Sequence, residues 1–168
     1  MTIKLEYPEG ATPLDPNEIG GLRHKHVTTQ GQLDELEQAN IITGFRWLAR
    51  TRRNDILTDD FAVELHRRLF GDVWDWAGSF RKTGKNIGVD PVQIGVQLRG
   101  LMDDAQYWAD HKTYPPIEAA VRLHHRMVFI HPIQMATAAT RALWRMSFST
   151  KSTEPPLSTG LQAQIFKK

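Results

Sequence analysis

The residues most suited to chemistry in this chain are a histidine and a proline at the end of a helical run. Pro132 lacks an N–H and ends the hydrogen bonding of that run, so His131 stands at the start of a loop. A loop in this position can cradle a phosphate if glycines let successive backbone N–H groups converge on the anion. Residues 136–140 are instead alanines and threonines. The histidine is present, but the glycines that the loop would need are not.

The other histidines nearby do not predict a metal site. His124 and His125 are adjacent and therefore point to different sides of a helix, and no pair among these histidines has the i, i+4 spacing of helical metal ligands. We expect no metal to be held by His131 and its neighbours.

Length and composition set the class of protein. The 168 residues are 40% hydrophobic and 24% charged, which predicts one globular domain. Cysteine is absent, which excludes disulfides and fits a cytoplasmic location. No signal-peptide pattern and no apolar run of roughly 20 residues occurs, so no membrane segment is expected. The net charge of +2 comes from scattered basic clusters, which argues against binding to nucleic acid.

Apolar residues repeat at helical spacing over most of the chain, so the fold is predicted to be mainly α. Residues 1–27 read as an extended arm with a short helical turn near Asn17, residues 28–148 as the folded domain, and residues 149–168 as a disordered tail. The expected helices cover about 29–53, 58–70, 90–110, 116–131 and 136–148. In the fourth of them, Ile117, Val121, His124 and Val128 form one stripe.

One segment departs from the helical pattern. Residues 72–89 hold Trp74, Trp76 and three glycines, which predicts a small β-hairpin flap with its turn at Lys82–Lys85.

Together these pieces resemble the Fic (Fido) family of nucleotidyl transferases, and most closely its branch called mobile mystery protein B, which occurs with mobile genetic elements. The likeness spans about residues 8–133 and is specific as a set rather than in any single piece. Its parts are Gly10–Pro16, Leu33–Glu35 with Glu37–Ile41, Leu65–Arg68, Phe70–Trp74 with Trp76–Gly78, Lys85–Pro91, and His124–Arg126 with His131–Pro132.

The resemblance implies a Fic-like helical bundle and a transfer of AMP, or another nucleotide moiety, from ATP with Mg²⁺ to a protein hydroxyl. It implies that His131 is the base that deprotonates the hydroxyl. It also implies that the flap residues Lys85, Asn86, Ile87 and Gly88 bind the main chain of a target protein by strand addition. A plain surface hairpin explains the flap nearly as well.

The chain departs from the family where the nucleotide should bind. The family motif resembles His-Pro-Phe-x-(Asp/Glu/Asn)-Gly-Asn-Gly-Arg. In it the acidic or amide residue binds Mg²⁺, Gly-Asn-Gly holds the nucleotide phosphates, and the arginine neutralises the outer phosphates. By position, Met135 replaces the metal ligand, Ala136, Thr137 and Ala138 replace Gly-Asn-Gly, and Ala139 replaces the arginine.

A single-base slip in the gene explains this departure better than gradual divergence, which is the alternative. Codons for Ile133 onward, read one base earlier, permit Pro-Asn-Gly-Asn-Gly-Arg, and Met135 followed by Ala136 forces the first glycine. We therefore expect residues from about 134 to be translated out of frame.

The sequence thus predicts a Fic-family protein that keeps its base and has lost its nucleotide loop, so that it binds ATP–Mg²⁺ weakly or not at all. The alternative is a non-catalytic interaction module of a mobile element, which binds a protein through the flap. A DNA-associated accessory role has no support in the charge pattern.

Overall fold

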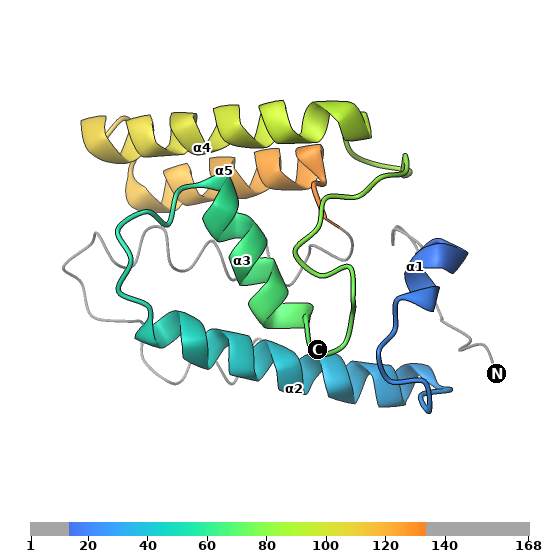
Figure 1. Ribbon diagram of the computed structural model, residues 1–168. Helices are drawn as coiled ribbons and strands as arrows, with labels where there is room; N and C mark the ends of the chain where they lie inside the picture. The colour runs from blue at the N-terminus through green and yellow to red at the C-terminus, as the bar shows by residue number, and fades with distance from the viewer. Residues whose placement is uncertain (1–13, 134–168) are drawn as a thin grey trace.

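The computed structural model describes residues 14–133, and this part of the chain is built from helices joined by irregular segments (Figure 1). The helices are α1 (Pro16–Gly20), α2 (Gln30–Arg50), α3 (Asp59–Phe70), a 3₁₀ turn (Pro91–Gln93), α4 (Ile94–His111) and α5 (Pro116–Ile130). Helices α4 and α5 lie side by side, α2 runs along the opposite side, and α3 contacts both α2 and α4. The predicted mainly α class is confirmed. Among the described helices, none is both long and apolar enough to cross a bilayer.

Side chains cap the starts of α2, of α3 and of the 3₁₀ turn before α4. The Thr29 hydroxyl accepts a hydrogen bond from the Gln32 N–H, and the Gln32 side chain accepts one from the Thr29 N–H, which completes a capping box at the start of α2. Thr58 caps α3 in the same way by accepting from Phe61 N–H at 3.1 Å. Asp90 accepts from Val92 N–H at 3.0 Å and starts the turn that leads into α4.

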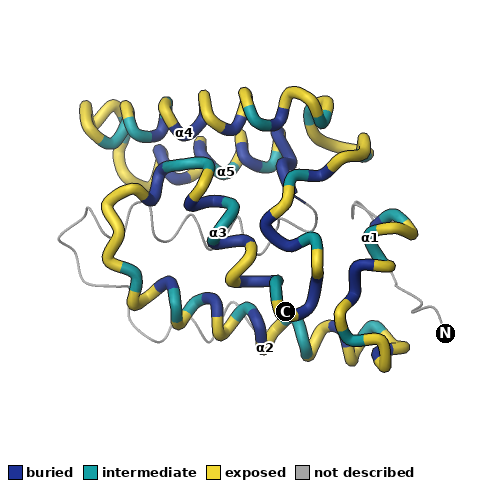
Figure 2. The backbone as a smooth tube through the Cα atoms, viewed as in Figure 1, coloured by how far each residue is buried: buried dark blue, intermediate teal, exposed yellow. Residues whose placement is uncertain are grey.

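The core forms where these helices face one another, and exposed residues lie on their outer sides (Figure 2). Helices α2 and α3 approach closely at Gly44, where a β-carbon would lie 2.8 Å from the carbonyl oxygen of Arg68. Beside it, the buried Asn40 amide donates to the Arg68 carbonyl at 3.1 Å and accepts from Asp72 N–H at 2.9 Å. This side chain ties the middle of α2 to the end of α3.

The predicted β-hairpin over residues 72–89 does not form, because no strand occurs anywhere in residues 14–133. Within this described part of the chain, one isolated β-bridge pairs Leu22 with Trp74. Side chains fix the segment instead: Trp74 is fully buried and its indole N–H donates to Glu37 Oε1 at 2.7 Å, while the Trp76 indole stacks on it with ring centres 5.0 Å apart. The contacts of the two indoles with distant residues hold this segment in place, whereas the glycine-rich pattern predicted hydrogen bonds between two strands.

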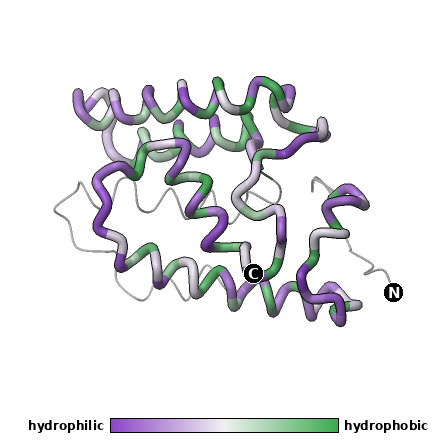
Figure 3. Tube along the Cα trace, viewed as in Figure 1, coloured by the Kyte–Doolittle hydropathy of each residue, from purple (hydrophilic) through white to green (hydrophobic). Residues whose placement is uncertain are grey.

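The stripe noted in the fourth expected helix is not the face of α5 that packs. Ile117 and Val121 are exposed, and the hydropathy of α5 alternates along its length (Figure 3). The buried residues of α5 are Ala119, Ala120, Leu123, Met127 and Ile130. Helix α5 therefore packs through these five residues, and Ile117 and Val121 lie outside that face.

The N-terminal arm contains the predicted short helix, α1, and its described part packs on the domain, because Leu14, Leu22 and Val27 belong to the common core. The predicted helix over 136–148 and the predicted tail over 149–168 lie outside the described residues.

Candidate active site

His131 lies directly after α5 and ends it. Its N–H donates to the Met127 carbonyl at 2.9 Å, and its backbone is left-handed, with φ 47° and ψ 61°. This conformation carries a cost of roughly 1 kcal/mol for a residue with a β-carbon. The residue is 5% exposed, and its Nε2 atom is buried and has no hydrogen-bond partner within residues 14–133. A buried polar atom without a partner is uncommon in native proteins and marks this ring as a candidate functional group.

The surroundings keep the His131 ring neutral. Burial, with the positive charges of Arg81 and Lys85, lowers the pKa of His131 to about 4. A neutral imidazole can accept a proton, but one with so low a pKa is a weak base at neutral pH. In this conformation the buried Nε2 atom is not accessible to a substrate hydroxyl.

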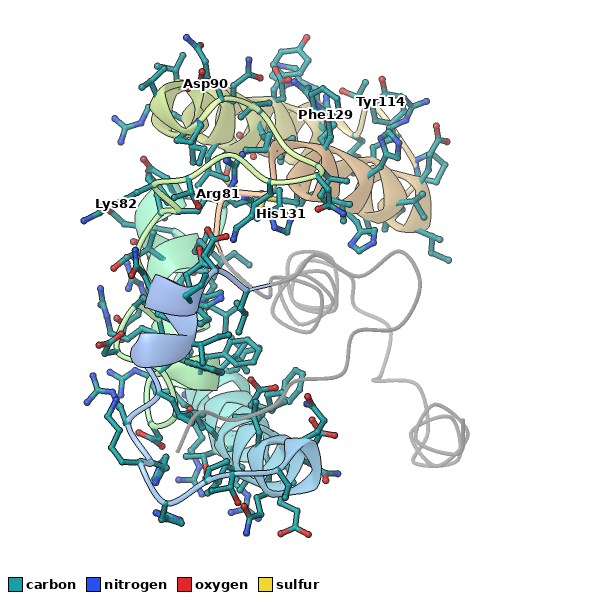
Figure 4. The ribbon with its side chains drawn as sticks, turned by 90° about the vertical axis from the view of Figure 1, so that its right-hand side faces the viewer. Arg81, Lys82, Asp90, Tyr114, Phe129 and His131 are labelled. Atoms are coloured by element: carbon teal, nitrogen blue, oxygen red, sulfur yellow. The ribbon has the colours of Figure 1, made fainter. Side chains whose placement is uncertain are left out.

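Arg81 is the residue of this site that the sequence does not reveal. Its guanidinium is buried and donates to main-chain carbonyl oxygens on both sides of the site, including that of His131 at 2.6 Å. Figure 4 shows Arg81 and His131 next to each other below the end of α5, while Lys82 points away from them. In the sequence, Arg81 lies beside Lys82 and reads as one of two surface cations.

The predicted flap residues do not form one surface. Lys85 turns inward, with its side chain 4% exposed, and forms ion pairs with Asp15 at 2.9 Å and Glu18 at 2.7 Å. Asn86 and Ile87 are exposed. The predicted target-binding set is therefore divided between a residue that anchors the loop and residues that face solvent.

Gly88 brings this loop against His131. A β-carbon on Gly88 would lie 2.8 Å from the His131 β-carbon and 2.6 Å from Arg81 Nη2, and its φ of 102° is costly for any other residue. Glycine is thus required where the loop crosses the end of α5.

Within residues 14–133, no three His, Asp or Glu side chains are grouped to hold a metal ion. The replaced nucleotide loop, Met135 to Ala139, lies outside the described residues.

Comparison with known proteins identifies the family of this chain. The model of the Fic/DOC family matches residues 56–138, which contain α3, α4, α5 and His131. The chain belongs to the Fic/DOC family. The assignment to its mobile mystery protein B branch stays a prediction.

Relatives in this family are named as adenylyltransferases. The chain is 28% identical over 115 residues to protein adenylyltransferase fic-1 of Caenorhabditis elegans, which covers 64% of this chain and 22% of that protein. It is 30% identical over 114 residues to the fic-1 protein of Caenorhabditis briggsae, covering 66% and 22%. With protein adenylyltransferase Fic of Aedes aegypti it shares 27% over 109 residues, covering 62% and 22%. The chain thus spans about a fifth of the length of these relatives.

Two crystal structures share the fold. The N-terminal Fic domain of a Bartonella effector protein from Bartonella sp. AR 15-3 aligns with a TM-score of 0.61 at 16% identity, over 74% of this chain and 65% of that one. A Fic family protein from Desulfovibrio desulfuricans G20 aligns with a TM-score of 0.56 at 16% identity, over 70% and 37%. They support the helical architecture of residues 14–133.

Proposed function

We propose that this chain descends from an AMP transferase that modifies protein hydroxyls and that it is itself catalytically disabled. The observation that carries the proposal is the loop after His131, where Met135 to Ala139 stand in place of the family's metal ligand, glycines and arginine. The names of the adenylyltransferase relatives support the ancestral activity.

The residues present do not fit ATP with Mg²⁺. A methionine thioether at Met135 is a poor ligand for Mg²⁺, which takes oxygen ligands. Ala136 and Ala138 carry β-carbons where a phosphate nest uses glycines, and Ala139 supplies no positive charge. Phosphoryl-type transfer depends on positioning and charge neutralisation, and removing one preorganised donor commonly costs about 10²- to 10³-fold in rate.

The state of His131 supports the same proposal. A general base contributes roughly 10²- to 10⁴-fold only when the substrate hydroxyl lies within hydrogen-bond reach. Nε2 of His131 is buried, and its low pKa of about 4 makes it a weak proton acceptor. The histidine alone therefore cannot replace the missing loop.

The test compares this chain with a frame-restored version that carries Pro-Asn-Gly-Asn-Gly-Arg directly after Ile133. ATP–Mg²⁺ binding is measured by calorimetry, and transfer is measured as labelled AMP incorporated into lysate proteins. We expect binding and transfer from the restored version alone, and loss of transfer when it also carries His131→Ala. Robust labelling by the present chain that His131→Ala abolishes would overturn the proposal, and sequencing the gene around codon 133 tests the slip itself.

A non-catalytic interaction protein is the second candidate, and the exposed side chains of Asn86 and Ile87 favour it. Such a protein would bind its partner equally well with and without nucleotide. Loss of that binding in an Ile87→Asp variant, with no effect of ATP, would support this function over the first.

A further inference from the structure

The Arg81 side chain satisfies four carbonyl groups at once. Its Nε donates to the His131 oxygen at 2.6 Å, Nη1 donates to the Thr83 oxygen at 2.9 Å, and Nη2 donates to the Ile130 oxygen at 3.3 Å and to the Val89 oxygen. The residue is 3% exposed, and no ion pair is formed by Arg81 within residues 14–133. A buried cation is costly unless its donors are satisfied, so this arrangement needs every one of these carbonyls.

These four carbonyls belong to two separate parts of the chain. Thr83 and Val89 flank the loop over residues 84–88, whereas Ile130 and His131 end α5. The last carbonyls of a helix have no partner within the helix and carry its partial negative charge, so a cation is favourable there. Backbone bonds join the same parts, from Arg81 N–H to the Pro132 oxygen at 3.0 Å and from Val89 N–H to the Ile130 oxygen at 3.3 Å.

We propose that Arg81 is a positioning residue, which holds the loop over residues 84–88 against the end of α5 and thereby fixes His131 in its buried, left-handed conformation. The planar fork of an arginine reaches several acceptors in fixed directions, which a lysine ammonium on a flexible stem does not do. The inference rests on the proposed assignment of His131 to the ancestral active site.

The competing explanation is that Arg81 only stabilises the fold, and it makes a different prediction. Replacing Arg81 would then lower the stability of the whole domain without a selective effect on His131. Positioning predicts instead that Arg81→Lys, which keeps the charge, releases His131 and the loop while the helices stay folded.

The experiment follows the 168-residue chain by NMR, with the His131 ring signal assigned by its loss in His131→Asn. Arg81→Lys is compared with Arg99→Lys as a matched control, because Arg99 is 67% exposed and pairs with Asp59 on the surface. The readouts are the pKa of the His131 ring and the amide exchange rates of Val89 and of residues in α2 and α3. Arg81, Lys85 and, through Arg81, Asp90 are the charged groups that act on this ring and its anchor.

We expect the His131 pKa to rise from about 4 toward 6.5 in Arg81→Lys, because the freed ring becomes hydrated. The Val89 amide should exchange about tenfold faster or more, while α2 and α3 amides and the Arg99→Lys control remain unchanged. An unchanged His131 pKa in a folded Arg81→Lys variant, or a uniform loss of protection in all helices, would overturn the proposal.

One measurement on the unaltered chain covers the case in which Arg81→Lys does not fold. The Arg81 Nε–H should exchange with water much more slowly than the Arg99 Nε–H, and equal rates would contradict the proposal. Neither readout uses nucleotide transfer, so a frame-restored chain that transfers no AMP would count against the proposed function and leave this inference standing.

Discussion

Lys85 and Glu18 form an ion pair with 2.7 Å between Nζ and Oε2, and this pair joins the loop before α4 to the short helix α1. The side chains are only 4% and 13% exposed, so both charges lie largely out of water. Lys85 also holds the pKa of the Asp15 carboxyl below its usual range by a direct hydrogen bond. The N-terminal segment therefore contributes directly to the conformation of the loop that lies against His131.

The first prediction concerns this ion pair. Glu18→Gln keeps an acceptor for the capping box of α1 and removes the charge that faces Lys85. It should lower the free energy of unfolding by about 1–3 kcal/mol, because it leaves a buried ammonium with one charged partner fewer. Glu118→Gln is the control, since its pair with Arg122 is 46–49% exposed, and we expect a change of less than about 0.5 kcal/mol. Urea unfolding measures both, and equal effects would show that the Lys85 pair contributes no more than a surface pair.

The second prediction concerns pH. The pKa of His131 in the folded chain is about 4, below the unfolded value near 6.5, so the unfolded chain binds more protons between these values. The contribution of the neutral His131 ring to the free energy of unfolding is therefore complete above about pH 6.5 and is lost as the pH falls toward 4. Between pH 7 and 5, the chain should lose about 2 kcal/mol more stability than a His131→Asn variant, which tolerates the left-handed backbone. Urea unfolding at pH 7 and at pH 5 measures both proteins. If both lose the same free energy of unfolding between these pH values, the low pKa of His131 is contradicted.

A third prediction compares two glycines of the same loop. Gly88→Ala places a β-carbon against His131 and Arg81 at a φ of 102°, so it should destabilise the domain by about 1–3 kcal/mol and raise the His131 pKa. Gly84→Ala meets no atom within 4 Å and serves as the control. Thermal unfolding and NMR titration of the ring decide the matter; a neutral Gly88→Ala would mean that the loop does not rest on His131.

The fourth prediction tests the packing of α2 on α3. A β-carbon on Gly44 would meet the Arg68 backbone at 2.8 Å, so Gly44→Ala should cost about 1–3 kcal/mol. Gly31→Ala, in the exposed first turn of α2, has open space and should stabilise by about 0.5–1 kcal/mol because alanine favours the helix. Opposite signs in denaturant unfolding are the expected result, and the same sign for both would argue against the close approach.

Local signals explain which parts of the fold were predictable. Thr29, Thr58 and Asp90 mark helix starts through bonds within a few residues, so the sequence alone locates them. The conformation of residues 72–89 is decided by distant partners, such as Glu37 for Trp74, and no local pattern contains that information.

The candidate site divides in the same way. His131 is found from its motif, which is a short contiguous pattern. Arg81 acts on carbonyl oxygens of Ile130 and His131 about fifty positions away, and carbonyl acceptors exist at every residue, so no side-chain type signals the contact. The inward turn of Lys85 likewise depends on Asp15 and Glu18, which are distant in the sequence.

The stacked indoles of Trp74 and Trp76 give this chain an internal optical probe. Their planes are inclined by 26° with centres 5.0 Å apart, close enough for their electronic transitions to couple. Coupled indoles produce a paired circular-dichroism signal that vanishes when the rings separate. The turn after α3 can therefore be followed without any label, and its opening distinguished from the melting of the helices, whose peptide bonds absorb independently of this pair.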